Sequence, residues 1–399
     1  MLRILQVVPF FYPAYAFGGP VRSVYFMSKE LVKRGHKVTV FTSDAKDLTA
    51  RLNIERLKLL DGMRVFYFRN LSLKLIKWLR LFITPELVLR AWEEVKGGKF
   101  DIIHLNGYRT FQNVVVGYYA HKYRVPYVLQ ARGSLPRKVI KQRLKHLYDV
   151  FFGHKLLKNA SRVIALSKYE AKQYMDMGIS KEKIEILPNG IPLSQYFDLP
   201  SKGSFKERIG IDKDKKIILY LGRINKIKGI DFLVKTYAYL IKKFKLDNTV
   251  LVIAGPDDGY LSELSSLISC LGVDNRILLT GPLYGRVKLE AYVDATICAY
   301  LNPYEPFGLV PLEAAACKTP VVVSAGTYMG EVVKKGGFGF SVKYGSIKSL
   351  SDVFLRVLSD ERLVEDLGET GRKYVFKNFS WDKVVEKLEK VYEEVVNQG

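Results

Sequence analysis

TICAYLNPYEPFGLVPLEAAAC, from Thr296 to Cys317, combines a strand signal, a loop signal and a helix signal in one short stretch. Its first residues are mainly apolar, as is typical of a buried strand. A proline-rich loop follows, and a helix is predicted to begin near Gly308, because Pro311 is tolerated only in a first turn. A strand followed by a helix is the repeating unit of an α/β fold.

The same alternation of strand and helix signals runs along the rest of the chain. A helix is expected over 21–34, and Thr84 and Pro85 are predicted to start another that ends at the glycines 97–98. Strands are predicted at 3–8, 36–44, 63–68, 100–105, 126–130, 161–166, 184–188, 215–224, 249–255, 275–281, 295–300 and 319–324. This order predicts mainly parallel, doubly wound sheets.

A proline- and glycine-rich stretch, NGIPLSQYFDLPSKGS at 189–204, interrupts the alternation and reads as a linker. The length of 399 residues also favours more than one domain. We therefore expect two Rossmann-like α/β domains with a cleft between them, a common place for ligands. The last segment, near 381–396, is predicted to be a strongly amphipathic helix.

Composition narrows the function classes. The chain has 63 Lys and Arg against 40 Asp and Glu, a net charge of +23, which suggests an anionic partner such as a nucleotide, nucleic acid or lipid surface. General solubility of the chain is the alternative explanation of this charge.

Three cysteines without CxxC spacing argue against a disulfide framework or a zinc site. The N-terminus reads as a strand and not as a signal peptide, and no apolar run is long enough for a membrane span, so we expect a cytoplasmic protein.

Two cations follow the first strand of the predicted second domain. Arg223 and Lys228, in LGRINKIKG, lie where ligands bind in a doubly wound domain and suit a diphosphate. The alternative is that both are solvated loop charges. The amides of Gly308, Leu309 and Val310, at a predicted helix start, are expected to hold a phosphate as well.

Two glutamates complete this candidate site. Glu313 lies about 7.5 Å along the helix axis from Gly308, a position suited to ribose hydroxyls beside the phosphate. Glu305, on the loop, is expected on the opposite side, where the transferred group would sit. The two carboxylates are thus predicted to bracket a nucleoside diphosphate, and not to flank one reacting atom as a glycosidase pair does.

The stretch EPFGLVPLE, together with LGRINKIKG, resembles the signature of retaining GT-B glycosyltransferases, especially family 4. ILPNGI resembles the end of that family's first domain, and the final helix resembles the one that crosses back to it. The resemblance implies a first, acceptor-side domain over 1–197 plus about 378–399, and a nucleotide-sugar-binding domain over 198–377.

The resemblance also implies roles for single residues. Arg223 and Lys228 would neutralise the leaving diphosphate, Glu313 would hold the ribose, and Glu305 would contact hydroxyls of the donor sugar near the reacting carbon. Further donor contacts are implied for Gly18, Gly19, Leu283, Tyr284 and Phe307. The family needs no metal ion for catalysis, so neither metal nor cofactor is expected. The acidic pairs Asp212/Asp214 and Asp257/Asp258 are interpreted as solvated turns, because Asp212 and Asp214 precede a strand in a charged turn and the second pair is similar.

The chain departs from the family at two positions near the expected reaction centre. Arg132 stands where many members have a histidine, and it cannot act as a base because a guanidinium stays protonated. It would instead hold donor or acceptor oxygens, or an acceptor phosphate. Where members show two histidines, this chain has His104 and then Asn106. His104 is either catalytic or a strand-end hydrogen-bonding residue.

Two basic segments point to the acceptor side. Residues 121–162 hold eleven Lys or Arg and one acid, and residues 71–83 set Lys74, Lys77 and Arg80 among bulky apolar residues. The segments 71–83 and 137–158 either pack on the first domain or lie on an anionic inner membrane face, which would fit a lipid-linked or glycan acceptor.

Two alternatives to a transferase remain open: a nucleotide-sugar hydrolase or epimerase on the same fold, and a nucleic-acid-binding protein. No known nucleic-acid-binding module is found.

Overall fold

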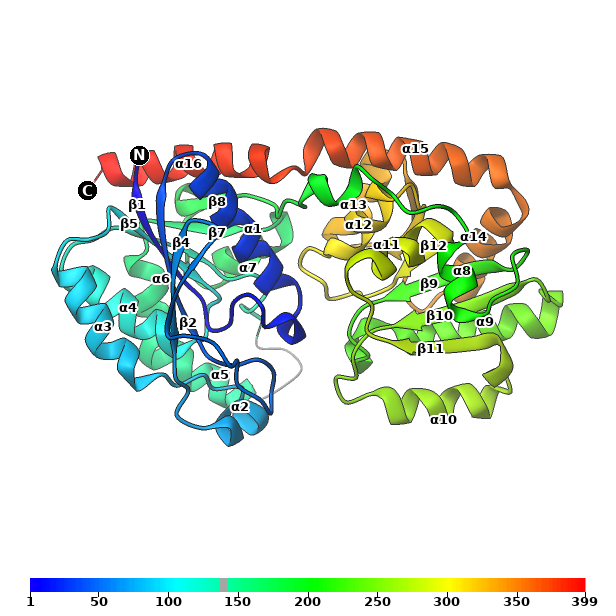
Figure 1. Cartoon of the computed structure of the whole chain (residues 1–399), viewed down its shortest axis with the longest axis horizontal. Helices are drawn as coiled ribbons and strands as arrows, with labels where there is room; N and C mark the ends of the chain where they lie inside the picture. Colours follow the sequence, from blue (N-terminus) through cyan, green and yellow to red (C-terminus); the bar gives the residue numbers. More distant parts are fainter. Residues whose placement is uncertain (137–141, 399) are drawn as a thin grey trace. The chain divides into compact units, whose positions relative to one another are not determined.

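The computed structural model describes residues 1–136 and 142–398, and its contacts divide the chain into two compact units (Figure 1). Unit 1 comprises Met1–Gly190 and Trp381–Gly399, and unit 2 comprises Ile191–Ser380. The sequence placed these boundaries at 197 and about 378. Each unit is built on its own parallel sheet with helices between the strands, so the predicted class of two parallel-sheet α/β domains is confirmed.

Unit 1 contains an eight-stranded sheet in the order β3-β4-β2-β1-β5-β6-β7-β8. All neighbours pair in parallel except β3, which runs antiparallel to β4 at one edge. The strands are β1 (Arg3–Val7), β2 (Lys37–Ser43), β3 (Leu57–Leu60), β4 (Met63–Phe68), β5 (Ile102–Asn106), β6 (Tyr127–Gln130), β7 (Arg162–Ala165) and β8 (Ile184–Ile186). The edge strand β3 was not predicted, because it is mostly exposed and lacks an alternating apolar pattern.

Helices cover both faces of this sheet. They are α1 (Gly19–Lys33), α2 (Leu73–Leu79), α3 (Pro85–Lys96), α4 (Phe111–Lys122), α5 (Gln142–Tyr148), α6 (His154–Asn159) and α7 (Lys168–Asp176), with a π-helical turn at Asp149–Gly153 and α16 (Trp381–Asn397). Alternate residues of β1 point into different clusters, so Leu5 and Val7 pack in one and Ile4 and Val8 in the other. Burial on both faces is what a doubly wound sheet requires.

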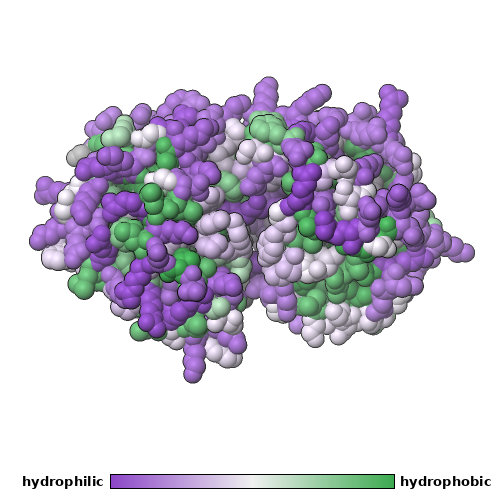
Figure 2. Space-filling view, in the orientation of Figure 1, coloured by the Kyte–Doolittle hydropathy of each residue, from purple (hydrophilic) through white to green (hydrophobic). Residues whose placement is uncertain are grey.

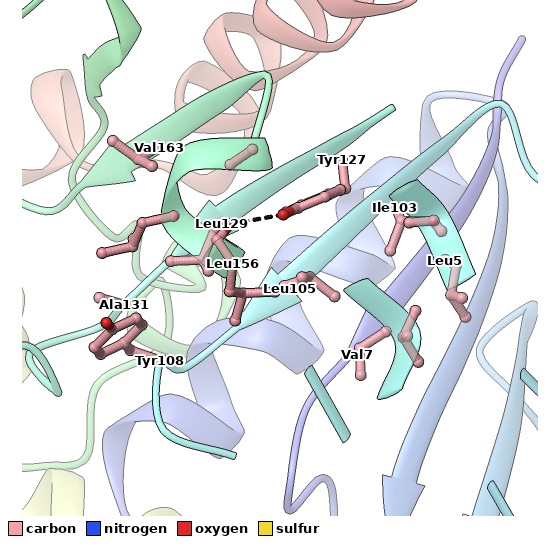
Figure 3. Close-up of a cluster of buried hydrophobic side chains, with 14 of the residues drawn as sticks. Leu5, Val7, Ile103, Leu105, Tyr108, Tyr127, Leu129, Ala131, Leu156 and Val163 are labelled. Carbon is pink, nitrogen blue, oxygen red and sulfur yellow. Dashed lines mark hydrogen bonds between the residues drawn. The ribbon is translucent and has the colours of Figure 1, made fainter. Parts of the chain in front are cut away.

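The first of these clusters lies between the sheet and helices α3, α4, α6 and α7. Figure 3 shows its centre, where Leu5, Ile103, Leu105 and Leu129 from neighbouring strands meet Leu156 of α6. The Tyr127 hydroxyl donates a 2.6 Å hydrogen bond to the Leu156 carbonyl oxygen, so this polar group is satisfied inside the core.

The second cluster is completed by α16, the last helix of the chain. Trp381, Val384, Val385, Leu388 and Tyr392 pack against Ile4, Val24 and Ile102 of unit 1. These positions form the apolar face that the sequence predicted for this segment, and the helix begins at Trp381. A Cβ added at Gly190 would lie 2.8–2.9 Å from Trp381, so a larger residue would disturb the helix start.

Unit 2 contains a six-stranded parallel sheet in the order β11-β10-β9-β12-β13-β14. Its strands are β9 (Lys216–Leu221), β10 (Thr249–Ala254), β11 (Ile277–Gly281), β12 (Ala295–Tyr300), β13 (Val321–Ser324) and β14 (Gly339–Val342). Its helices are α8 (Ser204–Ile209), α9 (Ile230–Phe244), α10 (Leu261–Leu271), α11 (Gly285–Asp294), α12 (Leu309–Ala316), α13 (Tyr328–Gly336), α14 (Ile347–Ser359) and α15 (Glu361–Asn378). From β9 the chain continues to β10 and β11 on one side of β9, and the next strand, β12, pairs with β9 on its other side. The strand order therefore reverses between β9 and β12. Ligands of doubly wound folds bind at such a reversal.

None of the helices within residues 1–136 and 142–398 combines the length and the apolar character needed to cross a lipid bilayer.

Candidate active site

The loop from Pro303 to Gly308 joins β12 to α12 at the carboxyl end of the unit 2 sheet. Gly308 has φ +85°, and a Cβ there would lie 2.9 Å from the ring of Tyr300. Only glycine fits this turn without strain. Helix α12 begins directly after it, at Leu309, with Pro311 in its first turn as predicted. The amides of Leu309 and Val310 therefore lie at the amino end of this helix, where an anion is stabilised.

Glu305 lies on this loop and is held by three donors from its own unit. Its Oε2 accepts hydrogen bonds from Lys228 Nζ at 2.6 Å, the Tyr300 hydroxyl at 2.7 Å and Asn302 Nδ2 at 3.0 Å. Burial raises the pKa of Glu305, but Lys228 and Tyr300 lower it by more, so the net pKa lies below the ordinary value. Glu305 is therefore an ionised carboxylate with a fixed orientation.

Lys228 and Arg223 both follow β9, and each contacts a carboxylate. Lys228 pairs with Glu305 across the point where the strand order reverses. Arg223 Nη1 lies 2.6 Å from Oδ2 of Asp258, which follows β10 and also accepts a bond from Asn225. The interpretation of Asp258 as a solvated turn residue is therefore wrong, since its carboxylate is largely covered and orients Arg223.

The other acidic residues of these turns have local roles or lie in solvent. The Asp257 carboxylate accepts hydrogen bonds from the amides of Gly259, Tyr260 and Leu261, which fixes the start of α10. Asp212 and Asp214 are exposed in a turn, as expected. Among the residues that the structure describes, no cluster of three or more His, Cys, Asp or Glu side chains has the arrangement of a metal site.

Glu313 lies in the second turn of α12 and is buried, which the sequence analysis did not foresee. Its Oε2 accepts 3.0 Å hydrogen bonds from Lys288 Nζ and the Tyr292 hydroxyl, both on α11. Lys288 is itself buried, so the two charges form an ion pair inside unit 2. Lys288 and Tyr292 were missed, although their spacing of four residues places them on one helix face.

Of the remaining site residues predicted in unit 2, Tyr284 lies at the surface and Phe307 lies in the core. Leu283 and Tyr284 connect β11 to α11, and Tyr284 is exposed one turn before Lys288. Phe307, in contrast, is buried and stacks on Tyr328 with ring centroids 5.3 Å apart. The aromatic ring of Phe307 therefore anchors the loop in the core, and its predicted donor contact stays a prediction.

The predicted residues of unit 1 lie near the carboxyl ends of β1, β5 and β6. Gly18, with φ +80°, precedes α1, and Gly19 is its first residue. Arg132 follows β6 and donates hydrogen bonds to Asn106 and Asn189. His104 is fully buried within β5, and its Nδ1 is hydrogen bonded to the Tyr392 hydroxyl.

Burial lowers the pKa of His104 well below the ordinary value, so its imidazole is neutral at physiological pH. Tyr392, its partner, belongs to α16. The structure thus supports the hydrogen-bonding role for His104 over the catalytic one, because its ring is fully buried and bonded to Tyr392.

Two protein-family models match the chain in succession. Glycosyltransferase Family 4 matches residues 17–195, and Glycosyl transferases group 1 matches residues 201–374. The chain is 28% identical over 412 residues to an uncharacterized glycosyltransferase of Methanocaldococcus jannaschii, with 97% of each chain covered. It is 25% identical over 408 residues to the N-acetyl-alpha-D-glucosaminyl L-malate synthase of Bacillus anthracis, with 96% of each covered.

Solved structures share the fold over the whole chain. Sucrose-phosphate synthase from Thermosynechococcus elongatus gives a TM-score of 0.76 at 22% identity, with 100% of both chains covered. An Anabaena protein solved in complex with UDP-glucose gives a TM-score of 0.77 at 20% identity, covering 99% of this chain and 100% of the other. Both comparisons support the GT-B fold.

Proposed function

Because the chain belongs to the group 1 and family 4 glycosyltransferases, we propose that it transfers a hexose from a nucleoside diphosphate sugar to an acceptor with retention of anomeric configuration. One observation carries this proposal: Lys228 and Glu305 are in contact at the reversal of strand order in unit 2. A cation for the leaving diphosphate and a carboxylate for the sugar thus lie at the expected ligand position.

The geometry of Glu305 suits the sugar end of the donor. All three of its hydrogen bonds from the described residues go to Oε2, and none of those residues occupies Oε1. The carboxylate is partly exposed, which leaves Oε1 able to accept a hydrogen bond from a sugar hydroxyl. Since Glu305 is already fixed by Lys228, Tyr300 and Asn302, little order is lost when the donor binds.

The diphosphate is proposed to bind between the α12 amino end and the two cations. Arg223 is partly exposed and held by Asp258, and Lys228 is held by Glu305. Negative charge develops on the diphosphate as the sugar leaves, so preorganised donors and cations stabilise the transition state more than the ground state. This electrostatic role is one that a metal ion fills in other transferases, and we propose that this chain needs none.

The two ends of the donor are assigned to different residues. Glu313 is proposed to act at the ribose, with its carboxylate oriented by Lys288 and Tyr292. Leu283 and Tyr284 would lie at the base, and Gly18 and Gly19 of unit 1 would supply further donor contacts. The retention of configuration is proposed from the spacing of Glu305 and Glu313 in EPFGLVPLE, the feature that resembles retaining enzymes.

We propose a lipid-linked or glycan acceptor and docking of unit 1 on an anionic membrane surface. The two basic segments carry exposed apolar side chains, which supports this proposal over the alternative that the segments simply pack on the domain. Trp78 is 71% exposed beside Lys74 and Lys77, and Phe151 is 69% exposed. Lys138, Ile140 and Lys141 lie outside the described residues. Figure 2 shows hydrophobic and hydrophilic side chains interspersed on one face of the molecule.

Exposed apolar residues flanked by cations match the chemistry of a lipid interface. Apolar groups enter the headgroup region while Lys and Arg attract anionic lipids, each adding about 1 kcal/mol. The exposed apolar side chains of these segments are Leu71, Trp78, Leu79, Leu81, Leu144, Leu147, Val150, Phe151 and Phe152. The exposed cations of the second segment include Arg143, Lys155 and Lys158.

The proposed activity is tested by incubating the chain with a panel of nucleoside diphosphate sugars, with and without glycan and lipid-linked acceptors. Acceptor-dependent release of nucleoside diphosphate and a product of unchanged anomeric configuration would support the proposal. Release without any acceptor product would indicate a hydrolase, and a changed sugar on the nucleotide would indicate an epimerase. Thermal stabilisation by oligonucleotides alone would favour the nucleic-acid-binding alternative.

A further inference from the structure

Arg132 lies at the carboxyl end of β6 in an unfavourable backbone conformation. Its φ is +52°, and the next residue, Gly133, has φ +83°. Glycine adopts this left-handed region easily, whereas a residue with a Cβ does so only when the surroundings require it. Such conformations cluster at functional sites. The chain thus keeps an arginine where a glycine would be easier to accommodate.

The guanidinium of Arg132 is held by neutral groups. Nε donates to Asn106 Oδ1 at 2.8 Å, and Nη1 donates to Asn189 Oδ1 at 2.9 Å. Nη2 lies 3.6 Å from the sulfur of Met27. A guanidinium carries five N–H groups, so each terminal nitrogen retains one N–H beyond these contacts. Arg132 is only half-buried, so a ligand can reach it.

No carboxylate among the described residues forms an ion pair with Arg132. The neighbouring Glu170 is fully buried, and its two oxygens accept backbone hydrogen bonds from Gly133 and Leu166. Arg109, on the same unit, shows the contrasting case, because its guanidinium pairs with Asp149. A partly buried cation normally has an anionic partner, and Arg132 forms no such ion pair within the described part of the chain.

A chain of hydrogen bonds holds this cation in place. Asn106 donates from Nδ2 to Gln6 Oε1 at 2.8 Å, and Gln6 donates to the Tyr392 hydroxyl at 3.3 Å. The orientation of Arg132 is therefore linked through buried side chains to α16. Burial lowers the pKa of Arg132 to about 10, which leaves it protonated at neutral pH.

We propose that Arg132 binds an oxyanion, a carboxylate or a phosphate, carried by the acceptor. This inference rests on the proposed transferase function. Unit 2 already supplies Arg223 and Lys228 for the donor diphosphate, whereas Arg132 belongs to unit 1 and lies beyond the carboxyl end of a parallel sheet, where ligands bind. A guanidinium with an N–H on each terminal nitrogen matches the two oxygens of either group.

The test measures thermal stabilisation by inorganic phosphate and by malonate at constant ionic strength, in protein saturated with the best-stabilising nucleoside diphosphate. Saturation occupies the diphosphate site, so the remaining response reports a second anion site. The unaltered chain and R124Q should respond alike, and R132Q should bind the anion at least tenfold more weakly. Arg124 is a matched control, because it is exposed and also has a positive φ, +56°.

A second variant keeps the test informative if R132Q does not fold. In N189D a carboxylate replaces the amide that lies 2.9 Å from Nη1, so Arg132 gains an internal ion pair. We expect this variant to melt at a higher temperature without added anion and to lose the anion response. A purely structural Arg132 would leave the anion response unchanged.

The outcomes separate this inference from the proposed function. Stabilisation by phosphate alone would identify a phosphate-bearing acceptor, and stabilisation by malonate a carboxylate-bearing one. An equal anion response in R132Q, R124Q and the unaltered chain would overturn the inference, as would the absence of any response in the unaltered chain. Failure of the proposed function would instead appear as no stabilisation by any nucleoside diphosphate, which is measured separately.

Discussion

His104 and Tyr392 are separated by 288 residues in the sequence, and their side chains share a 2.6 Å hydrogen bond in the core of unit 1. The bond joins a central strand of the sheet to the last helix of the chain. His104 is neutral and buried. The Tyr392 hydroxyl also accepts a hydrogen bond from Gln6, whose side-chain oxygen accepts one from Asn106, so these side chains form one network. The final helix thus contributes polar as well as apolar contacts to the fold.

This network makes the stability of unit 1 depend on pH. Burial lowers the pKa of His104, so below pH 6.5 the unfolded chain binds a proton that the folded chain does not. We expect the free energy of unfolding to fall as the pH drops through this range, by up to about 1.4 kcal/mol per pH unit from this residue. Urea unfolding of the chain and of H104N at pH 5 to 8 measures it. An identical pH dependence in both would contradict the prediction.

Substitution of Glu305 should impair turnover more than nucleotide binding, since its carboxylate is assigned to the sugar. E305Q keeps the size of the side chain and its hydrogen-bonding oxygen, so we expect a large loss of kcat with nearly unchanged affinity for the nucleoside diphosphate. Single-turnover transfer and calorimetric binding provide the two measurements. If E305Q loses affinity for the nucleoside diphosphate as strongly as turnover, the assignment to the sugar is wrong.

Glu313 requires a different design, because it forms a buried ion pair with Lys288. Removing one partner of such a pair costs about 3–5 kcal/mol, since the other charge stays buried. E313Q should therefore lower both the melting temperature and nucleotide affinity. The double variant E313Q/K288M should recover much of the stability without recovering the affinity. Full recovery of both would show that Glu313 acts only in the core.

Arg223 and Lys228 should matter for the diphosphate and not for the nucleoside. A hydrogen bond to a charged group typically contributes about 1.5–3 kcal/mol, which corresponds to an affinity loss of tens-fold. R223Q and K228Q are expected to weaken nucleoside diphosphate binding by this amount and to leave binding of the bare nucleoside unchanged. Equal losses for both ligands would refute a phosphate role for these cations.

Docking on a membrane is tested with liposomes. We expect the chain to co-sediment with anionic liposomes at low salt, to be released as salt rises, and not to bind neutral liposomes. R143Q/K155Q/K158Q should weaken binding by about fivefold per residue, without a change in donor hydrolysis. K168Q/K172Q/K181Q, an equal loss of charge from exposed residues of the same unit, is the control. Equal binding of the two triple variants would contradict the assigned surface.

The sequence predicted the alternation of strands and helices well, because buried parallel strands are continuous apolar runs that are easily recognised. It missed β3, which is short and mostly exposed, and β14, which is short and only partly buried. The positions of Glu305, Arg223 and Lys228 at strand ends also followed from the pattern. Their carboxylate and cation partners did not, since Arg223 and Asp258 are 35 residues apart and pairing at that distance depends on the order of the strands.

The same reason explains what the sequence did not predict. Phe307 lies in the expected loop, but only the packing of Tyr328 against it shows that its ring lies in the core. Glu313 was predicted from its depth along the helix, and Lys288 on a different helix decides its environment. Local periodicity determines which face of an element is buried, and it contains no information on which side chain from another element will lie there.

The location of α16 also determines the order in which the molecule is completed during translation. The ribosome makes the strands of unit 1 first, then all of unit 2, and only then the helix that begins at Trp381. Until that helix emerges, the apolar face around Ile4, Val24 and Ile102 has no cover, and Gln6 lacks its hydroxyl partner. The nascent chain therefore leaves this apolar face uncovered throughout the synthesis of unit 2, and a chain truncated before Trp381 exposes the face permanently.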